Sequence, residues 1–101
     1  MLNQQLILPR EKITHFCQKW NVTEFALFGS VLREDFNVSS DIDALVTFAK
    51  TSQTSLFDLA QMQLELQELF GRPVDMVEKA SLTNPYRKTA ILDSAEVIYA
   101  T

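Results

Sequence analysis

A Gly-Ser pair that interrupts an apolar run constrains this chain more than any other feature of its sequence. Residues 25–28 (Phe-Ala-Leu-Phe) are apolar throughout, and Gly29 and Ser30 follow them directly. This pattern predicts a strand that ends in a tight turn, with a helix beginning at the turn. The first backbone N–H groups of a helix have no partner within it, so they can bind a phosphate. Gly29 and Ser30 are therefore candidate phosphate-binding residues.

An acidic pair follows this turn after ten intervening residues. Asp41 and Asp43 are separated by one residue, and residues 44–46 (Ala-Leu-Val) continue the run as a strand would. Side chains two residues apart in a strand point to the same face, so the carboxylates of this pair lie side by side. Their mutual repulsion is relieved when a cation lies between them. Asp41 and Asp43 are therefore candidate metal ligands.

A third acid lies in a later apolar segment. Asp75 follows Val74 and precedes Met76 and Val77, although aspartate is disfavoured in strands. If its strand neighbours the strand of Asp41, about 4.8 Å away, three carboxylates converge on one patch. Such hard oxygen ligands suit Mg²⁺ bound together with substrate phosphates. A solvated residue on an edge strand is the alternative interpretation of Asp75, and the spacing alone does not separate the two.

The remaining patterns predict an alternation of helices and strands. The predicted helices span residues 9–20, 55–70 and 84–95, with a short helix at 30–33, and the predicted strands span 22–28, 41–48, 74–77 and 97–99. Ser55 and Asp58 form a capping box, and Gly71 ends the long helix. In this helix Phe57, Phe70 and the leucines are predicted core residues. The order predicts an α/β fold of the α+β type, a small mixed β-sheet with helices packed on one face, as one domain over residues 1–101.

Composition and charge exclude several classes of protein. A hydrophobic fraction of 47% with 22% charged residues argues against disorder. The net charge of −4 disfavours direct binding of nucleic acid, since phosphate backbones are bound by clustered Lys and Arg. Cys17 is the single cysteine and falls in an apolar helical pattern, so it is predicted in the core. No apolar run is long enough for a membrane span and no signal peptide opens the chain, so a cytoplasmic location is expected.

Two segments together resemble a known family signature. Residues 27–33 (Leu-Phe-Gly-Ser-Val-Leu-Arg) and 40–46 (Ser-Asp-Ile-Asp-Ala-Leu-Val) are similar to the GS, ten residues, DxD motif of the minimal nucleotidyltransferases. This family belongs to the polymerase-beta-like superfamily. Residues 55–59, 71–77 and 97–99 follow its layout as well, so the resemblance covers nearly the whole chain. It implies the nucleotidyltransferase fold.

The resemblance also implies roles for individual residues. Gly29 and Ser30 would hold the β- and γ-phosphates of ATP, and Arg33 is a further candidate nucleotide-binding residue. The three acids, Asp41, Asp43 and Asp75, would hold two Mg²⁺ ions about 3.5–4 Å apart, and Asp75 would also help to deprotonate the attacking hydroxyl. The family carries glycine after the motif arginine, whereas this chain has Glu34. Arg33 could therefore steady a phosphate, pair with a neighbouring acid or face water.

Larger relatives add a helical domain that helps to form the acceptor site, and this chain ends at Thr101 without one. The resemblance thus implies that the acceptor arrives on a partner. Small members of the family act as antitoxins beside a HEPN-type ribonuclease toxin, and they transfer AMP from ATP to a tyrosine of the toxin. The alternatives are an antitoxin that blocks the toxin by binding alone, with catalysis dispensable, and nucleotidyl transfer to a small molecule or RNA.

Overall fold

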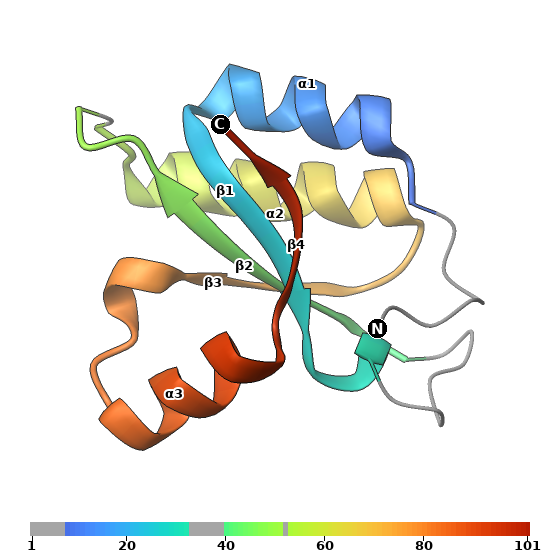
Figure 1. The fold of residues 1–101 in the computed structure, drawn as a ribbon. Helices are drawn as coiled ribbons and strands as arrows, with labels where there is room; N and C mark the ends of the chain where they lie inside the picture. Colours follow the sequence, from blue (N-terminus) through green and yellow to red (C-terminus); the bar gives the residue numbers. More distant parts are fainter. Residues whose placement is uncertain (1–7, 33–39, 52) are drawn as a thin grey trace.

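Within residues 8–32, 40–51 and 53–101, which the computed structural model describes, the chain forms a four-stranded sheet in the order β3-β2-β1-β4 (Figure 1). The elements in chain order are α1 (Arg10–Trp20), β1 (Val22–Phe28), the 3₁₀ helix η1 (Gly29–Leu32), β2 (Ile42–Phe48), α2 (Leu56–Phe70), β3 (Val74–Glu78), the 3₁₀ helix η2 (Lys79–Ser81), α3 (Pro85–Ser94) and β4 (Glu96–Ala100). Each predicted helix and strand is present, with its ends within about one residue of the predicted bounds. The predicted α+β fold with a small mixed sheet is confirmed.

The sheet is mixed because its strands pair in two ways. β1 is antiparallel to both β2 and β4, whereas β2 and β3 are parallel. Parallel neighbours need a long crossover connection, and α2 supplies it between β2 and β3. The end of β1, the start of β2 and the start of β3 therefore meet at one end of the sheet.

Helices α1 and α2 cover one face of the sheet, as Figure 1 shows. Ile13, Phe16 and Cys17 form the buried face of α1, and Met62 and Leu66 form that of α2. The spacing of three and four residues in these sets is the helical periodicity from which both helices were predicted. The ring of Phe16 packs edge-on against that of Phe25 of β1, with 6.3 Å between centroids. The principal core thus lies between these two helices and the sheet.

Helix α3 packs against the opposite face. There Leu82 and Ile91 join Ala26, Phe28 and Leu45 in a second, smaller cluster. The prediction that the helices pack on one face is therefore wrong for α3, which has a single fully buried residue and so carries no clear apolar stripe. Side chains alternate along a strand, so Leu45 and Asp43 share this face. Helix α3 packs over this face at Leu45 and not at Asp43.

The predicted ends of α2 are confirmed. The Ser55 hydroxyl accepts a hydrogen bond from the Asp58 N–H, and the Asp58 carboxylate accepts one from the Ser55 N–H, at 3.1 Å each. At the other end Gly71 has a φ of +69°, a left-handed conformation that a residue with a side chain adopts only with strain. These caps fix the length of the crossover between β2 and β3.

The prediction that Phe57 and all leucines of α2 belong to the core is wrong. Phe57 is 89% exposed, Leu56 is 83% exposed and Leu64 is 55% exposed. The buried face of α2 is marked by Met62 and Leu66. Leu64 is two residues from each of these and Phe57 is five residues from Met62, and at 3.6 residues per turn both offsets lead to the far side of the helix. Among the described residues, no helix is long and apolar enough to cross a membrane.

A polar cluster joins α1 to α2 outside the core. The Glu65 carboxylate accepts hydrogen bonds from Lys19 Nζ at 3.0 Å, Trp20 Nε1 at 3.1 Å and Gln61 Nε2 at 3.2 Å. Burial raises the pKa of the Glu65 carboxyl, but these three hydrogen bonds and the charge of Lys19 outweigh it and hold the pKa below its ordinary value. The charged form of Glu65 therefore stabilises the folded chain.

Two leucines of α2 test the assignment of the core. Leu66→Ala should lower the free energy of unfolding by about 2–5 kcal/mol, because it removes a fully buried side chain and leaves a cavity. Leu64→Ala removes the same atoms from a half-exposed site and should cost about 1 kcal/mol or less. Urea denaturation of both variants measures the difference. Equal losses at the two positions would contradict the orientation of α2.

The Glu65 cluster makes a prediction about pH. A carboxyl whose folded pKa lies below its unfolded value, about 4.3, stabilises the fold above that value, and the contribution is lost as pH falls through the folded pKa. Glu65→Gln should therefore lower the melting temperature at pH 7, and the difference from the parent should shrink as pH falls below about 4. Thermal melts over this pH range test it, with the exposed Glu68→Gln on the same helix as control. A difference that is independent of pH would contradict the role given to Glu65.

Candidate active site

Gly29 makes the turn at the end of β1. Its φ is +73°, in the left-handed region that favours glycine. A Cβ placed on Gly29 would overlap the Asp43 carboxylate, with its Cγ 3.2 Å away. The turn from β1 into η1 therefore passes directly against Asp43, at a distance that a side chain would prevent. This is the physical reason for glycine before Ser30.

Asp43 and Asp75 lie next to each other on neighbouring strands. In the parallel register of β2 and β3 they are direct partners, and on the other side of β2 Asp43 is opposite Phe28, the last residue of β1. Register partners point to the same face of a sheet, and neighbouring strands are about 4.8 Å apart. The structure thus brings together two of the three predicted acids beside the Gly29 turn. Asp43 is half-buried and Asp75 is exposed.

Asp41 lies just before β2 rather than within it. β2 begins at Ile42, whose N–H donates to the Pro73 carbonyl at 2.9 Å, and Asp41 is exposed. The predicted strand therefore begins one residue too early. Strand alternation fixes the face of Asp43, but it does not fix that of Asp41, which lies outside the strand. Among the described residues, no three His, Cys, Asp or Glu side chains form a group that could hold a metal ion.

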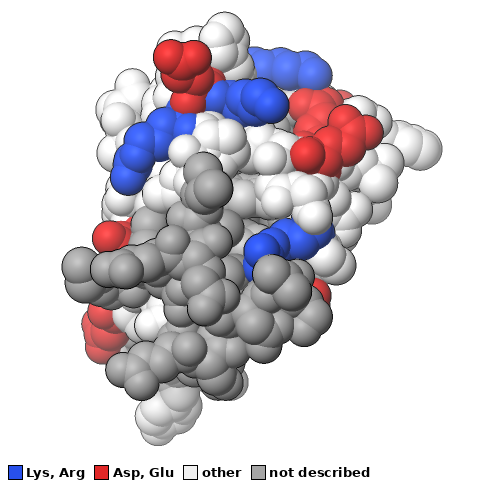
Figure 2. Space-filling model, turned by 90° about the vertical axis from the view of Figure 1, so that its right-hand side faces the viewer, with Lys and Arg blue, Asp and Glu red and all other residues white. Residues whose placement is uncertain are grey.

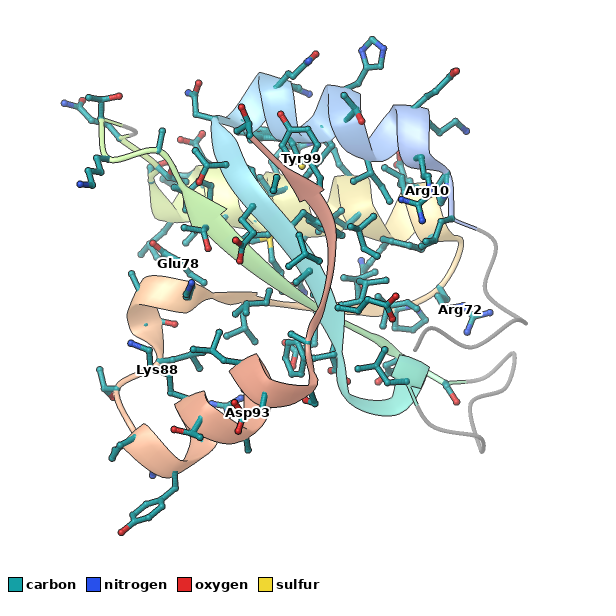
Figure 3. The ribbon with its side chains drawn as sticks, viewed as in Figure 1. Arg10, Arg72, Glu78, Lys88, Asp93 and Tyr99 are labelled. Carbon is teal, nitrogen blue, oxygen red and sulfur yellow. The ribbon has the colours of Figure 1, made fainter. Side chains whose placement is uncertain are left out.

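Arg72 has a role that the sequence patterns do not indicate. It is half-buried, and its Nη1 donates to the Ser40 carbonyl at 3.3 Å. This bond ties the segment before Asp41 to the start of β3, next to the bond between Ile42 and Pro73. Figure 3 shows Arg72 at the same end of the sheet as η1. Arg72 is therefore a positioning residue for the acids, and only the fold reveals its partner.

Two predicted nucleotide-binding residues are described in part or not at all. Ser30 lies in η1, where the backbone is described and its side chain is not, and Arg33 lies outside the described residues.

On the face that Figure 2 shows, the coloured Lys, Arg, Asp and Glu side chains are interspersed. Burial in the core between the helices and the sheet raises the pKa of the Cys17 thiol to about 12, which favours the protonated thiol.

Comparison with known proteins places this arrangement in a family. Residues 9–98 match the family described as "Nucleotidyltransferase domain". The chain belongs to this nucleotidyltransferase family. A Methanocaldococcus jannaschii protein, provisionally named protein adenylyltransferase MJ1217, is 38% identical over 74 residues, which are 73% of this chain and 74% of that protein. The protein adenylyltransferase MntA of Thermococcus cleftensis is 34% identical over 82 residues, covering 81% of this chain and 78% of the relative.

Solved structures agree with the family. One of a protein assigned to the minimal nucleotidyltransferases is 32% identical, with a TM-score of 0.70 and 86% of each chain covered. A toxin–antitoxin crystal structure with AMP-PNP has a TM-score of 0.73 at 21% identity, covering 93% of this chain and 75% of that one, so it shows the shared fold. The chain is thus a nucleotidyltransferase enzyme with the minimal nucleotidyltransferase fold.

Gly29 and Gly71 form a matched pair that tests the turn. Both have a positive φ, so alanine should cost about 1–2 kcal/mol of stability at either position. Only at Gly29 does the new Cβ meet the Asp43 carboxylate, because nothing lies within 4 Å of the position at Gly71. Gly29→Ala should therefore abolish nucleotidyl transfer while Gly71→Ala retains it, with radiolabelled ATP as the assay. An equal loss of activity in Gly29→Ala and Gly71→Ala would contradict a specific role for the Gly29 turn.

Proposed function

We propose that this chain transfers AMP from ATP to a tyrosine hydroxyl of a HEPN-type ribonuclease toxin and thereby neutralises it. The relatives named protein adenylyltransferase support a protein acceptor. Among structures of the same fold, one contains AMP-PNP within a toxin–antitoxin complex, and another is a tri-AMPylated Shewanella oneidensis HEPN toxin in complex with an MNT antitoxin. The observation that carries the proposal is the register pairing of Asp43 with Asp75 beside the Gly29 turn.

The reaction is an in-line displacement at the α-phosphorus of ATP. The acceptor oxygen forms a bond to this phosphorus, the bond from it to the oxygen bridging to the β-phosphate breaks, and pyrophosphate leaves. The proton of the acceptor hydroxyl passes to a carboxylate, the role proposed for Asp75. Asp75 is exposed, so a hydroxyl carried by another protein can approach it. The backbone N–H groups of η1 at Gly29 and Ser30 would hold the departing phosphates.

Mg²⁺ is the ion proposed for this site, with two aligned carboxylates as its first ligands. Asp43 and Asp75 are aligned across β2 and β3, and carboxylate oxygens together with phosphate oxygens are the ligands that this ion prefers. Asp41, one residue before β2, would supply the third carboxylate. When bound, Mg²⁺ neutralises charge that develops on the phosphate oxygens. The close approach of Gly29 to Asp43 keeps the phosphate turn and the acids within reach of the same triphosphate.

Single amide substitutions test the acids. Asp43→Asn and Asp75→Asn should each lower transfer of label from α-³²P-ATP to a HEPN-type toxin by about 10²-fold or more, because each removes charge that acts on the transition state. Asp93→Asn on α3 is the control, since Asp93 is exposed and lies outside the proposed site. EDTA should abolish labelling by the parent. Unchanged melting temperatures would show that the variants fold.

The same acids separate catalysis from neutralisation by binding. A double variant, Asp41→Asn with Asp43→Asn, should fail to protect cells that express the toxin, provided that complex formation is retained. Protection equal to that of the parent would show that binding alone neutralises the toxin. Full labelling by Asp75→Asn would instead contradict the assignment of Asp75 as proton acceptor, and it would leave the proposed nucleotidyltransferase reaction in place.

A further inference from the structure

An open groove lies along β3, beside the N-terminal half of α2. Its volume is about 770 Å³, and its walls include Ala60 and Leu64 of α2, Met76, Val77 and Glu78 of β3, and Arg87 of α3. Hereafter this is the α2–β3 groove. β3 is an edge strand of the described sheet, so no further strand continues beneath this part of α2. Figure 3 shows Glu78 near the end of β3, between α2 and α3 in that view.

The groove continues onto exposed apolar side chains of α2. Leu64 lines the groove and is still 55% exposed, and Phe57, seven residues earlier on the same side of the helix, is 89% exposed. Leu56 is four residues before Ala60 and is 83% exposed. Scattered apolar residues are common on protein surfaces, whereas large side chains that adjoin an apolar groove mark interaction sites. The helix is capped and its core side is fully packed, so the fold itself does not need these residues.

We propose that the α2–β3 groove is the docking surface for the acceptor protein, which inserts an apolar segment flanked by Lys or Arg. This inference rests on the proposed function, because it assigns the surface that recruits the protein acceptor. The groove is lined by the strand that carries Asp75, and Met76 and Val77 follow this acid directly. A segment held there brings the rest of its protein to the edge of the sheet where the hydroxyl must arrive.

The charge around the groove favours a basic partner. α2 contains no Lys or Arg and carries Asp58 and Glu68, while its third acid, Glu65, is paired with Lys19 of α1. Glu68 is one turn from Leu64, and Glu78 lies in the groove itself, where Arg87 is the cation on the opposite wall. The whole chain has a net charge of −4, so two copies repel each other and a basic protein is attracted.

Substitutions at Leu64 separate apolar contact from charge. Leu64→Glu and Leu64→Lys have similar helix propensity, and the site is half-exposed, so both variants should fold. We expect Leu64→Glu to weaken binding of the HEPN protein by about 10-fold and Leu64→Lys by about 100-fold, because only lysine adds repulsion from a basic partner. Phe57→Lys should match Leu64→Lys. The control is Val97→Lys on β4, which changes the same charge at a residue 52% exposed on the other edge of the sheet.

Calorimetry with a HEPN-type toxin measures the affinities, and labelling of this toxin from ATP is followed in parallel. Parental affinity in both lysine variants, or an equal loss in Val97→Lys, overturns the docking surface. So does a dimer of the free chain that Leu64→Lys converts to a monomer while toxin binding persists, because a second copy would then occupy the groove. A parent that binds the HEPN protein without labelling it overturns the proposed function alone, and a parent that does not bind it overturns both.

Discussion

The parallel pairing of β2 with β3 is the constraint on which the rest of this structure depends. It sets Asp43 directly beside Asp75. A slip of one residue would turn one of the two acids to the face that α1 and α2 cover. Parallel strands need a crossover, and α2 both makes this connection and supplies Met62 and Leu66 to the core. The burial of α2 therefore fixes the register of the acids. The geometry of the proposed site is thus a consequence of how the longest helix packs.

This geometry is unfavourable for the folded chain by itself. Two carboxylates on adjacent strands, about 5 Å apart, repel by about 1–3 kcal/mol where water still screens them. The Gly29 turn adds a left-handed residue in close contact with the Asp43 carboxylate. The bond from Arg72 to the Ser40 carbonyl and the bond from Ile42 to Pro73 hold the neighbouring backbone against this repulsion. Contacts that have no part in the proposed chemistry thus offset the stability that is lost at the acids.

Much of the fold follows from local patterns in the sequence. The parts that could not be predicted have one cause in common. Helical and strand periodicity, the Ser55 capping box and the Gly29 turn depend on near neighbours, so they could be predicted. The exposure of Phe57, the packing of α3 on the second face and the partner of Arg72 depend on where the sheet ends and which strands adjoin. An apolar residue in a helix predicts burial only if a neighbouring layer extends beneath it. Phe57 lies on the side of α2 turned away from Met62, where no other layer of the described residues covers it.

The exposed side of α2 and the edge of β3 have a common explanation in the proposed transfer to a protein acceptor. An uncovered edge strand and large exposed apolar residues favour aggregation, and proteins normally cover or charge them. This chain instead keeps Phe57 and Leu64 beside an open strand whose first acid is Asp75. A small acceptor would gain nothing from such a surface, since it could bind within the site. A macromolecular acceptor needs contact area outside the reacting groups, and the α2–β3 groove provides it next to the strand that bears the proposed base.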